Sequence, residues 1–531
     1  MIKNALDRLS AGQFAVSYGL FRQAVLTSPR QAVAWFGLSQ ASARLPAAAD
    51  KAFAFAERAL MALDGHERSR LQAEVFKNFG QLLHQRPSQA HRPSAKTCFQ
   101  QAVIIAPSLS SAMLAFAATG APTDRQKWLG RALKSAPSRS NSWEVAGELR
   151  RSGGDIIAAQ KYYRRALILT PSAHHSQTFL GIAQKSLGDL ITSTITFQRA
   201  VILAPSYLPA CTTLGRNYLL QRDFKRGWEF FEAEWRHHKT RPDAIGHDLP
   251  LWTGAPIPNG QLLLWSDDQI GDEVLFANLL PALRKHVSSL TVAVDRRIVP
   301  YLAAALPAVE FIAKTDQQRL RQAAKTASAG YRLEFIGRFL LNDAAQLPPP
   351  QALLKSTPIM PPEQKRPRVG LSFHSINPTI GDYKSIRLAT LSPLLSLPGI
   401  DWVNLQYGDH EQEISTTAKA LGIHIEQNPD ADQIQHFDEF LKRLATIDLV
   451  ISIPNTTVHL AGAMGIETWV MLPRGPGQSW FWFDDGEQAS WYPKTRIFRQ
   501  KTPLQWDPVV TAVRDAMTDR LPSSQQPLLP A

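Results

Sequence analysis

A glycine–aspartate pair near the middle of the chain has the residue types and the position needed for proton transfer. Gly271 and Asp272 lie in DDQIGDEVLF, which we predict to be a loop between an apolar strand and an amphipathic helix. Glycine lets a backbone approach a ligand closely, and a carboxylate in such a loop faces the crevice beyond the strand. Asp272 is therefore a candidate general base for a hydroxyl group. The alternative is that Asp272 only caps the helix that follows.

A lysine follows a second predicted strand. Lys384 lies in GDYKSIRL, in the loop after the apolar run RVGLSF. An ammonium group in this position can neutralise the phosphates of a leaving nucleotide. The hydroxyl of the adjacent Ser385 can donate to the same phosphates. The alternative is a loop lysine that is simply solvated.

The segment NTTVHLAGAMG carries the clearest local motif. Asn455, Thr456 and Thr457 lie where a strand becomes a helix, so backbone N–H groups and the helix dipole point toward an anion. His459 lies in the first turn, within reach of a phosphate or a ribose. A lone histidine is more often structural than functional. Its place in this motif favours a site role instead.

Two further side chains are predicted to line the same pocket. Gln406 ends the run WVNLQ, and Trp480, in GQSWFW, has a ring that can stack on a sugar or a base. Tyr492 is predicted to pack near a domain hinge, outside the site. Asp484 and Asp485 are adjacent, but they lie in a late loop and are expected to face solvent. We therefore expect no bound metal and no cofactor.

The elements that position these residues alternate between strand and helix from residue 261 onward. The predicted strands are 261–266, 290–295, 309–313, 368–375, 402–408, 449–455 and 467–473, with helical segments between them. This alternation is typical of parallel sheets with crossover helices, and residues 347–367 form a proline-rich linker between two such sheets. The sequence predicts two small doubly wound domains, 236–360 and 361–518, and a flexible tail, 519–531.

The first half of the chain repeats every 34 residues. The period is visible in four registers: Pro137, Pro171 and Pro205; Ala132, Ala166 and Ala200; Gly147, Gly181 and Gly215; Asp155, Asp189 and Asp223. Each unit reads as two helices ended by proline, with small residues that let the helices approach. The pattern resembles the tetratricopeptide repeat. We assign five to six repeats to residues 1–235, and such arrays stack into a superhelix whose concave groove binds peptides or proteins.

Charge and composition exclude several classes of protein. The net charge is +13, and residues 1–240 carry 31 Lys and Arg against 15 Asp and Glu, so the basic excess belongs to the repeats. No nucleic-acid motif accompanies it. The two cysteines form no metal pattern and no disulfide framework. No apolar run of the roughly 18 residues that a membrane span needs is visible, and no signal peptide is visible, so we expect a cytoplasmic protein.

The second half resembles the C-terminal module of bacterial tetratricopeptide-repeat glycosyltransferases. That module is similar to heptosyltransferases of glycosyltransferase family 9, and the whole architecture resembles soluble flagellin glycosyltransferases. The matching segments are GWEFFEAEW, PLWTGAPIPNGQLLLW, IGDEVLFANLLP, DYKSIRLATLSPLLSLPGIDWVNLQYG, NTTVHLAGAMG and SWYPKTRIFRQ. Two positions depart from the family pattern: the loop EQGLGD reads DDQIGD here, and Pro454 replaces an aspartate.

The resemblance implies a GT-B arrangement of two Rossmann-like domains and a metal-independent, inverting transfer. It implies that Asp272 is the base and that Lys384 clamps the donor phosphates. The donor site would comprise Asn455, Thr456, Thr457 and His459, with a nucleotide sugar as co-substrate. The expected acceptor is a Ser or Thr hydroxyl of a protein held by the repeats, with flagellin the leading candidate. Two alternatives stay open: a binding scaffold whose transferase module has decayed, and a transferase for a glycan or lipid-linked acceptor.

Overall fold

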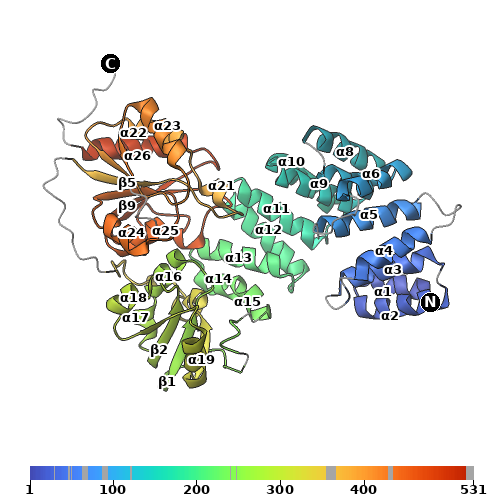
Figure 1. Ribbon diagram of the computed structural model, residues 1–531, viewed down its shortest axis with the longest axis horizontal. Helices are drawn as coiled ribbons and strands as arrows, with labels where there is room; N and C mark the ends of the chain where they lie inside the picture. Colours follow the sequence, from blue (N-terminus) through green and yellow to red (C-terminus); the bar gives the residue numbers. More distant parts are fainter. Residues whose placement is uncertain are drawn as a thin grey trace. The chain divides into compact units, whose positions relative to one another are not determined.

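The structure is a computed structural model (Figure 1). It describes residues 1–28, 30–45, 48, 51–62, 70–85, 94–119, 122–238, 241–246, 248–354, 366–427 and 434–521. Most of the predicted linker (355–365) and of the predicted tail (522–531) lies outside the described residues. The chain divides into two compact units, Met1–Ala183 and Gln184–Ala531. The domain boundary predicted at residue 235 stays a prediction.

The first unit is entirely helical where it is described. Its helices are α1 (Ile2–Ser10), α2 (Phe14–Thr27), α3 (Ala32–Ala43), α4 (Ala52–Met61), α5 (Arg70–Gln85), α6 (Ala95–Ile105), α7 (Ser110–Thr119), α8 (Pro122–Ser135), α9 (Ser140–Ser152), α10 (Ile156–Leu169) and α11 (His174–Ser186), the last of which continues into the second unit. Consecutive helices pack against each other, as α9 does against α10. This helical region resembles a tetratricopeptide-repeat solenoid.

The repeat registers have clear structural roles. α8, α10 and the later helix α12 (Leu190–Leu203) each end two residues before the repeated proline. The repeated aspartates are N-caps: Asp155 accepts the N–H of Ala158 at 3.1 Å, and Asp189 accepts that of Thr192 at 3.0 Å. Each cap satisfies a backbone donor that the helix leaves unpaired. The 34-residue period therefore encodes both where helices stop and where the next ones begin.

The repeated glycines let paired helices touch, as their spacing predicts. A Cβ added to Gly147 of α9 would lie 2.6 Å from a ring carbon of Tyr163 in α10. A Cβ added to Gly215 of α13 (Leu208–Leu220) would lie 2.2 Å from the backbone nitrogen of Phe231, the last residue of α14 (Phe224–Phe231). Real Cβ contacts are not this short, so a methyl group at either position requires a neighbour to move.

We expect Gly215→Ala to destabilise the second unit by about 3 kcal/mol, because backbone atoms cannot rotate away as a side chain can. The measurement is thermal unfolding of the purified chain. The matched control is Gly130→Ala in α8, where no atom lies within 4 Å of the added methyl group. That change should be neutral or stabilise by up to about 1 kcal/mol, since alanine favours helix. Equal behaviour of the two variants would contradict the close approach of α13 and α14.

The last repeat is joined to the α/β region through an arginine in a turn. Arg222 occupies the register of Gly154 and Gly188 and shares their left-handed backbone, with φ of 62°. Its Nε donates to Asp485 Oδ1 at 2.8 Å, and its guanidinium lies 3.9 Å from the centre of the Phe483 ring. Such backbone strain persists only where surrounding contacts hold it. Asp485 faces solvent as expected, with 68% of its side chain exposed, and it is also one of the partners that fix the turn.

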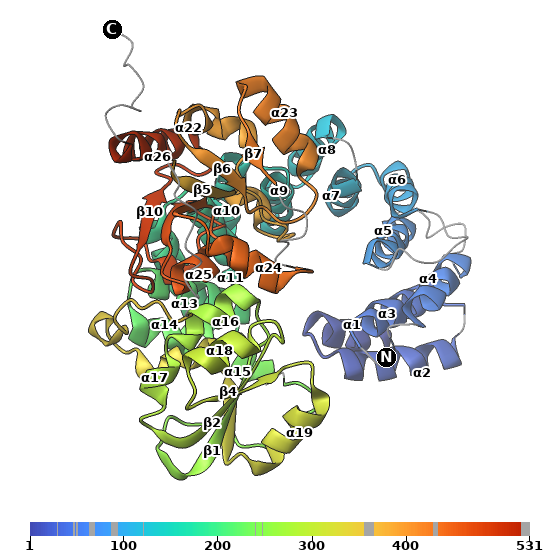
Figure 2. The same cartoon turned by 60° about the vertical axis from the view of Figure 1, so that its left-hand side comes forward.

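The second unit holds two parallel sheets (Figures 1 and 2). The first contains β1 (Ile257–Trp265), β2 (Val287–Val294), β3 (Glu310–Ala313) and β4 (Ala329–Arg332), in the order β3-β2-β1-β4. The second contains β5 (Arg368–Ser372), β6 (Asp401–Asn404), β7 (Ile425–Glu426), β8 (Leu449–Ser452), β9 (Glu467–Leu472) and β10 (Thr495–Arg499), in the order β10-β9-β8-β5-β6-β7. A parallel-sheet α/β region therefore follows the helical repeats.

Helices cross between the strands and complete this unit. They are α15 (Ala233–His238), α16 (Ile270–Ala277), α17 (Leu280–Leu283), α18 (Val299–Ala305), α19 (Gln317–Thr326), α20 (Gly337–Leu340), α21 (Gly381–Lys384), α22 (Ser392–Leu395), α23 (Glu411–Leu421), α24 (Phe437–Leu444), α25 (Thr456–Ala463) and α26 (Asp507–Arg520). One hydrophobic core runs from α14 through the first sheet to α24 and α25, and a second core lies between the other face of the second sheet and α26. The shared core brings the carboxyl ends of β1 and β8 close together.

Candidate functional site

Two helix starts meet where the two sheets approach each other. α16 follows β1, α25 follows β8, and the two helices lie side by side in both views (Figures 1 and 2). A Cβ added to Gly271 would lie 3.0 Å from His459 Cδ2 and 3.3 Å from Thr456 Cα. Gly271 thus permits close approach, as predicted, but its neighbour here is α25. The contact places Asp272 beside the start of α25.

Asp272 lies in the first turn of α16 with an electrostatic environment suited to proton transfer. Burial raises the pKa of its carboxyl group to about 6, Lys384 opposes the rise, and the charges of Glu334 and Glu273 add to it. The N-cap of α16 is Gln269, which makes no side-chain cap bond. Asp272 therefore does not cap this helix through its side chain. A carboxylate with a pKa near neutral pH is well matched to general-base work.

Lys384 ends the short helix α21, on the second-sheet side of the same site. Burial lowers the pKa of its ammonium group, and the charge of Asp272 opposes that change. Its aliphatic stem passes Gly477, where an added Cβ would lie 3.0 Å from Lys384 Cγ. Within the part of the chain that the structure describes, no hydrogen bond or ion pair engages its Nζ. The ammonium is thus held in place by packing and is available to an anion.

The DDQIGD loop is held by hydrogen bonds to a buried glutamate. Glu334 Oε1 accepts from Ser266 Oγ at 2.8 Å and from the backbone N–H of Asp267 at 2.9 Å. It also accepts the N–H of Asp268 at 3.2 Å. Burial, with the charges of Glu334 and Asp272, raises the pKa of Asp268 to about 7. Sequence reasoning noted Asp268 only as a departure from the family loop, although it is a second carboxylate of unusual pKa beside Asp272.

The start of α25 is built as an anion-binding turn would be. Asn455 is the N-cap: its Oδ1 accepts the N–H of Thr457 at 3.1 Å, and its Nδ2 donates to Ser372 Oγ at the end of β5 at 2.8 Å. Thr456 is the first helical residue. The hydroxyl of Thr457 is buried and has no hydrogen-bond partner within the described ranges. Asn455 thus links the end of β8 to the end of β5, while the Thr457 hydroxyl makes no hydrogen bond among the described residues.

His459 is buried in an aromatic box and is neutral. Its side chain is 5% exposed, and burial together with the charge of Lys384 lowers its pKa to about 3. Its Nδ1 lies 2.9 Å from the hydroxyl oxygen of Tyr492. Sequence reasoning left Tyr492 out of the site because its only local signal was aromatic packing. His459 therefore acts as an uncharged hydrogen-bonding group.

Three predicted site residues make hydrogen bonds or ring contacts with the surrounding protein. Ser385 Oγ accepts the N–H of Ser375 at 3.0 Å and donates to the carbonyl of Gly381 at 2.8 Å, so it closes its own loop. Gln406 uses both polar ends of its amide on the backbone around the ends of β5 and β6. Trp480 does not face an open pocket: its ring lies 5.3 Å from Trp228 and is 7% exposed. These side chains shape the site instead of lining it.

No group of three or more His, Cys, Asp or Glu residues that could hold a metal ion occurs among the described residues. A pair of histidines does follow the strands of the second sheet. His374 comes after β5, His410 comes after β6, and their ring centres are 4.6 Å apart. Burial and the neighbouring His410 lower the pKa of His374. These rings lie at the same sheet edge as Ser372 and were not predicted, since each lies alone in its segment of sequence.

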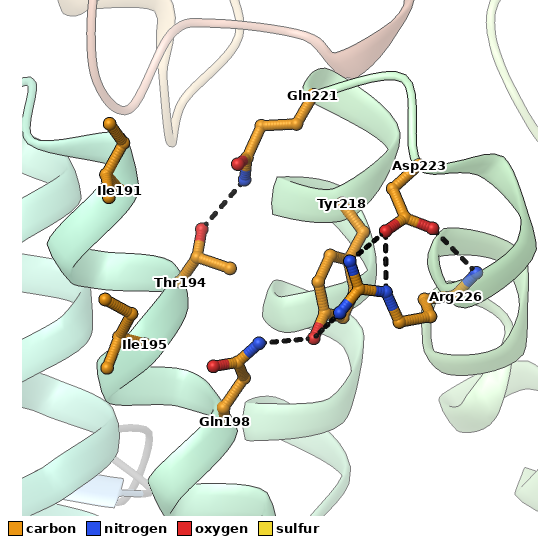
Figure 3. A pocket seen from close by; sticks show the side chains of 8 residues that line it. All are labelled: Ile191, Thr194, Ile195, Gln198, Tyr218, Gln221, Asp223 and Arg226. Atoms are coloured by element: carbon orange, nitrogen blue, oxygen red, sulfur yellow. Dashed lines mark hydrogen bonds and ion pairs between the residues drawn. The ribbon is translucent and has the colours of Figure 1, made fainter.

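A separate groove of about 330 Å³ lies in the repeat region (Figure 3). Ile191 and Ile195 of α12 form one wall. Gln198, also on α12, donates across the groove to the Tyr218 hydroxyl of α13 at 2.7 Å, and on that opposite side Arg226 donates to Asp223 at 2.6 Å. The remaining lining residues are Thr194 and Gln221. The groove therefore belongs to the repeats, and its polar groups bond to one another.

The site and fold define a chain of helical repeats followed by a parallel-sheet α/β region. The chain is 30% identical over 316 residues to the protein FlbA of Caulobacter vibrioides (strain ATCC 19089 / CIP 103742 / CB 15). The alignment covers 55% of this chain and 52% of that protein, so the chain spans about half the length of the curated relative it matches. No family model matches the chain.

Solved structures of other proteins are similar to parts of this chain. The Cut9–Hcn1 hetero-tetramer of the APC/C matches with a TM-score of 0.37 and 11% identity, over 45% of this chain and 46% of that one. MamA matches with a TM-score of 0.25 and 17% identity, over 28% of this chain and 91% of that one. The C-terminal part of a TPR repeat-containing protein from Cytophaga hutchinsonii matches with a TM-score of 0.29 and 12% identity, over 46% and 98%.

No helix within the described residues is both long enough and apolar enough to cross a membrane.

Both cysteines, Cys98 and Cys211, are buried and free. Burial raises the pKa of the Cys98 thiol to about 11, so it stays protonated near neutral pH. Neither thiol belongs to the site around Asp272.

Proposed function

We propose that the chain is a glycosyltransferase that moves a sugar from a nucleotide sugar to a Ser or Thr hydroxyl of a protein. The observation that carries the proposal is the convergence of Asp272, Lys384 and the start of α25. They combine a carboxylate with a pKa near 6, an ammonium without a partner among the described residues, and a helix N-terminus. A base facing an anion-binding site is the arrangement that displacement at a sugar–phosphate bond requires.

The strand orders support a GT-B arrangement of two Rossmann-like domains. In the second sheet, chain order runs outward in both directions from β5, which lies beside β6 on one side and β8 on the other. This is the order of a doubly wound nucleotide-binding sheet, whose ligands bind beyond the carboxyl ends of the two central strands. Asn455 and Ser372 meet at that point, 2.8 Å apart. The first sheet follows the same order through its four strands.

In the proposed reaction, the acceptor oxygen attacks the anomeric carbon as the bond from that carbon to the donor phosphate breaks. Asp272 takes the hydroxyl proton. The leaving nucleotide carries the negative charge that develops on its phosphate, and Lys384 and the N–H groups that start α25 stabilise that charge. A single displacement of this kind inverts the anomeric configuration.

The helical repeats support a protein acceptor. Solenoids of this kind present extended surfaces to polypeptides, and the basic excess of residues 1–240 favours an acidic or polar partner. Flagellin is the leading candidate from the resemblance to flagellin glycosyltransferases. We place the reaction in the cytoplasm, without nucleic acid as a partner.

The proposal is tested by thermal unfolding of the purified chain with UDP-, GDP-, ADP- and CMP-sugars. A ligand that binds only the folded state stabilises it by mass action, by about 2.7 kcal/mol at a hundred times its Kd. We expect one nucleotide class to raise the unfolding temperature and the others to leave it unchanged. The absence of any shift at millimolar concentration would count against the proposed donor site.

A further inference from the structure

We propose that Tyr492 is a positioning residue that fixes His459 as the neutral tautomer with its proton on Nε2, so that the imidazole keeps an N–H donor on the ring nitrogen that Tyr492 does not contact. The use of that donor in binding rests on the proposed function. The tautomer itself rests only on the geometry around the two side chains.

The two side chains form a buried pair. The Tyr492 hydroxyl oxygen lies 2.9 Å from His459 Nδ1, and Tyr492 is 1% exposed. Tyr492 reaches this position because Gly462 of α25 has no side chain: a Cβ added there would lie 2.6 Å from Tyr492 Cγ. The absence of a side chain at Gly462 therefore lets the Tyr492 ring pack directly against α25.

The direction of this hydrogen bond follows from the chemistry of the two groups. Burial, and the charge of Asp272, raise the pKa of Tyr492 well above 10, so the phenol keeps its proton. His459 is neutral because burial lowers its pKa. A neutral imidazole has one N–H donor and one bare acceptor nitrogen. Among the described residues His459 Nδ1 is the one hydrogen-bond partner of the Tyr492 hydroxyl, so a proton on Nδ1 would leave the buried phenol proton without an acceptor. The phenol therefore donates to Nδ1, and the histidine proton is on Nε2.

The imidazole ring of His459 is held between aromatic side chains and the start of α16. His459 is enclosed by Phe481 at 5.5 Å, Trp482 at 5.4 Å and Tyr492 at 5.9 Å between ring centres. Its Cδ2 lies 3.0 Å and its Cγ 3.6 Å from a Cβ added to Gly271, so the Cδ2–Cγ edge of the ring faces the start of α16.

An uncharged donor suits this position better than a second cation. Lys384 already supplies positive charge, and its field is one cause of the low pKa of His459. A neutral N–H can hold a substrate oxygen without competing for the charge of Lys384. Loss of the Tyr492 hydroxyl leaves Nδ1 as a buried acceptor with no donor. The imidazole proton is then free to move to Nδ1, and the site loses its donor in that fraction of molecules.

Nitrogen-15 NMR of histidine-labelled protein tests the inference. The His459 signals are assigned by their loss in His459→Gln. In the parent chain we expect an unprotonated Nδ1 and a protonated Nε2, unchanged between pH 5 and 8. Tyr492→Phe should shift both signals, whereas Tyr331→Phe, which removes another buried hydroxyl (3% exposed, bonded to Glu232 at 2.8 Å), should not. A proton on Nδ1, or an imidazolium, in the parent chain would overturn the inference.

A binding measurement separates the inference from the proposed function. Titration with UDP, GDP, ADP and CMP should show about fivefold weaker binding of the preferred nucleotide to Tyr492→Phe, the usual effect of one neutral hydrogen bond. If none of the four binds the parent chain, the proposed function fails, while the NMR result still decides the tautomer. If the preferred nucleotide binds both forms equally and the tautomer does not change, the positioning role is excluded.

Discussion

We expect an Asp272→Asn variant to transfer sugar about a thousandfold more slowly than the parent chain, within the range that general bases contribute. Asparagine keeps the shape of the side chain and removes the atom that takes the proton. The parent rate should also fall as the pH drops below about 6, because the pKa of Asp272 is raised to that value and the protonated form cannot act as a base. The measurement is the initial rate of nucleotide release with acceptor present, from pH 5 to 9.

The same variant should be more stable than the parent chain at alkaline pH. The carboxyl group has a pKa of 3.8 before burial and about 6 in the fold, so its charged form destabilises the folded state above pH 6. The difference disappears below pH 4, where the group is protonated in both states. After allowance for partial exposure, we expect a gain of about 1 kcal/mol at pH 8.

Asp519→Asn, at the exposed end of α26, is the control for that gain and should change neither rate nor stability. A slow Asp272→Asn variant with unchanged stability would still leave the base role in place. A variant with the parent rate at every pH would remove it.

A Lys384→Met variant should bind the nucleotide donor about thirtyfold more weakly, as expected for one hydrogen bond to a charged group. Methionine keeps the stem that packs beside Gly477 and removes the charge. The pKa of Asp272 should also rise further, because Lys384 opposes its increase, so the acid limb of the rate profile moves to higher pH. Isothermal titration and the pH profile measure the two effects.

The matched control is Lys419→Met in the last turn of α23, an exposed lysine away from the site. It should leave both donor affinity and the pH profile unchanged. If Lys384→Met moves the pH profile but not the donor affinity, Lys384 acts on Asp272 alone and the phosphate-clamp role is wrong.

The helical repeats could be predicted because each carries its own signals. Proline marks the end of a helix, glycine marks a helix contact, and the aspartate at the start of the next helix caps it, all within 34 residues. The period shows where these residues recur without any knowledge of tertiary structure. Arg222 breaks the pattern at the last turn because its side chain serves the α/β region, a contact that repeat register cannot reveal.

Seven of the ten described strands could be predicted. β1, β2, β5, β8 and β9 contain continuous apolar runs, as central parallel strands do, and β3 and β6 are shorter apolar runs. β4, β7 and β10 were not predicted as strands. β10 and β7 lie at sheet edges. The residues of β10 alternate between polar and apolar, and β7 has only two residues, while β4 begins with Ala and Gly. Such segments become strands through their pairing partners, which lie far away in the sequence.

The candidate site also contains residues that local sequence predicts and residues that it does not. Asp272, Lys384 and Asn455 could be predicted because they follow apolar runs, at the edge where parallel strands end. The roles of Tyr492 and Trp480 depend on how residues 480–492 fold back onto α25 and α14, which no local pattern specifies. Sequence reasoning predicted that Trp480 lines the pocket and that Tyr492 packs near a domain hinge, whereas both side chains are buried in the same core and Tyr492 also contacts His459.

The central claim is that this chain places a sugar on a protein, and intact-mass spectrometry of flagellin co-expressed with it tests that claim most directly. We predict a mass increase equal to one or more sugar units on Ser or Thr, absent when the chain carries Asp272→Asn. Flagellin of unchanged mass, recovered in complex with a folded chain that binds its nucleotide sugar, would contradict the claim and favour a binding scaffold.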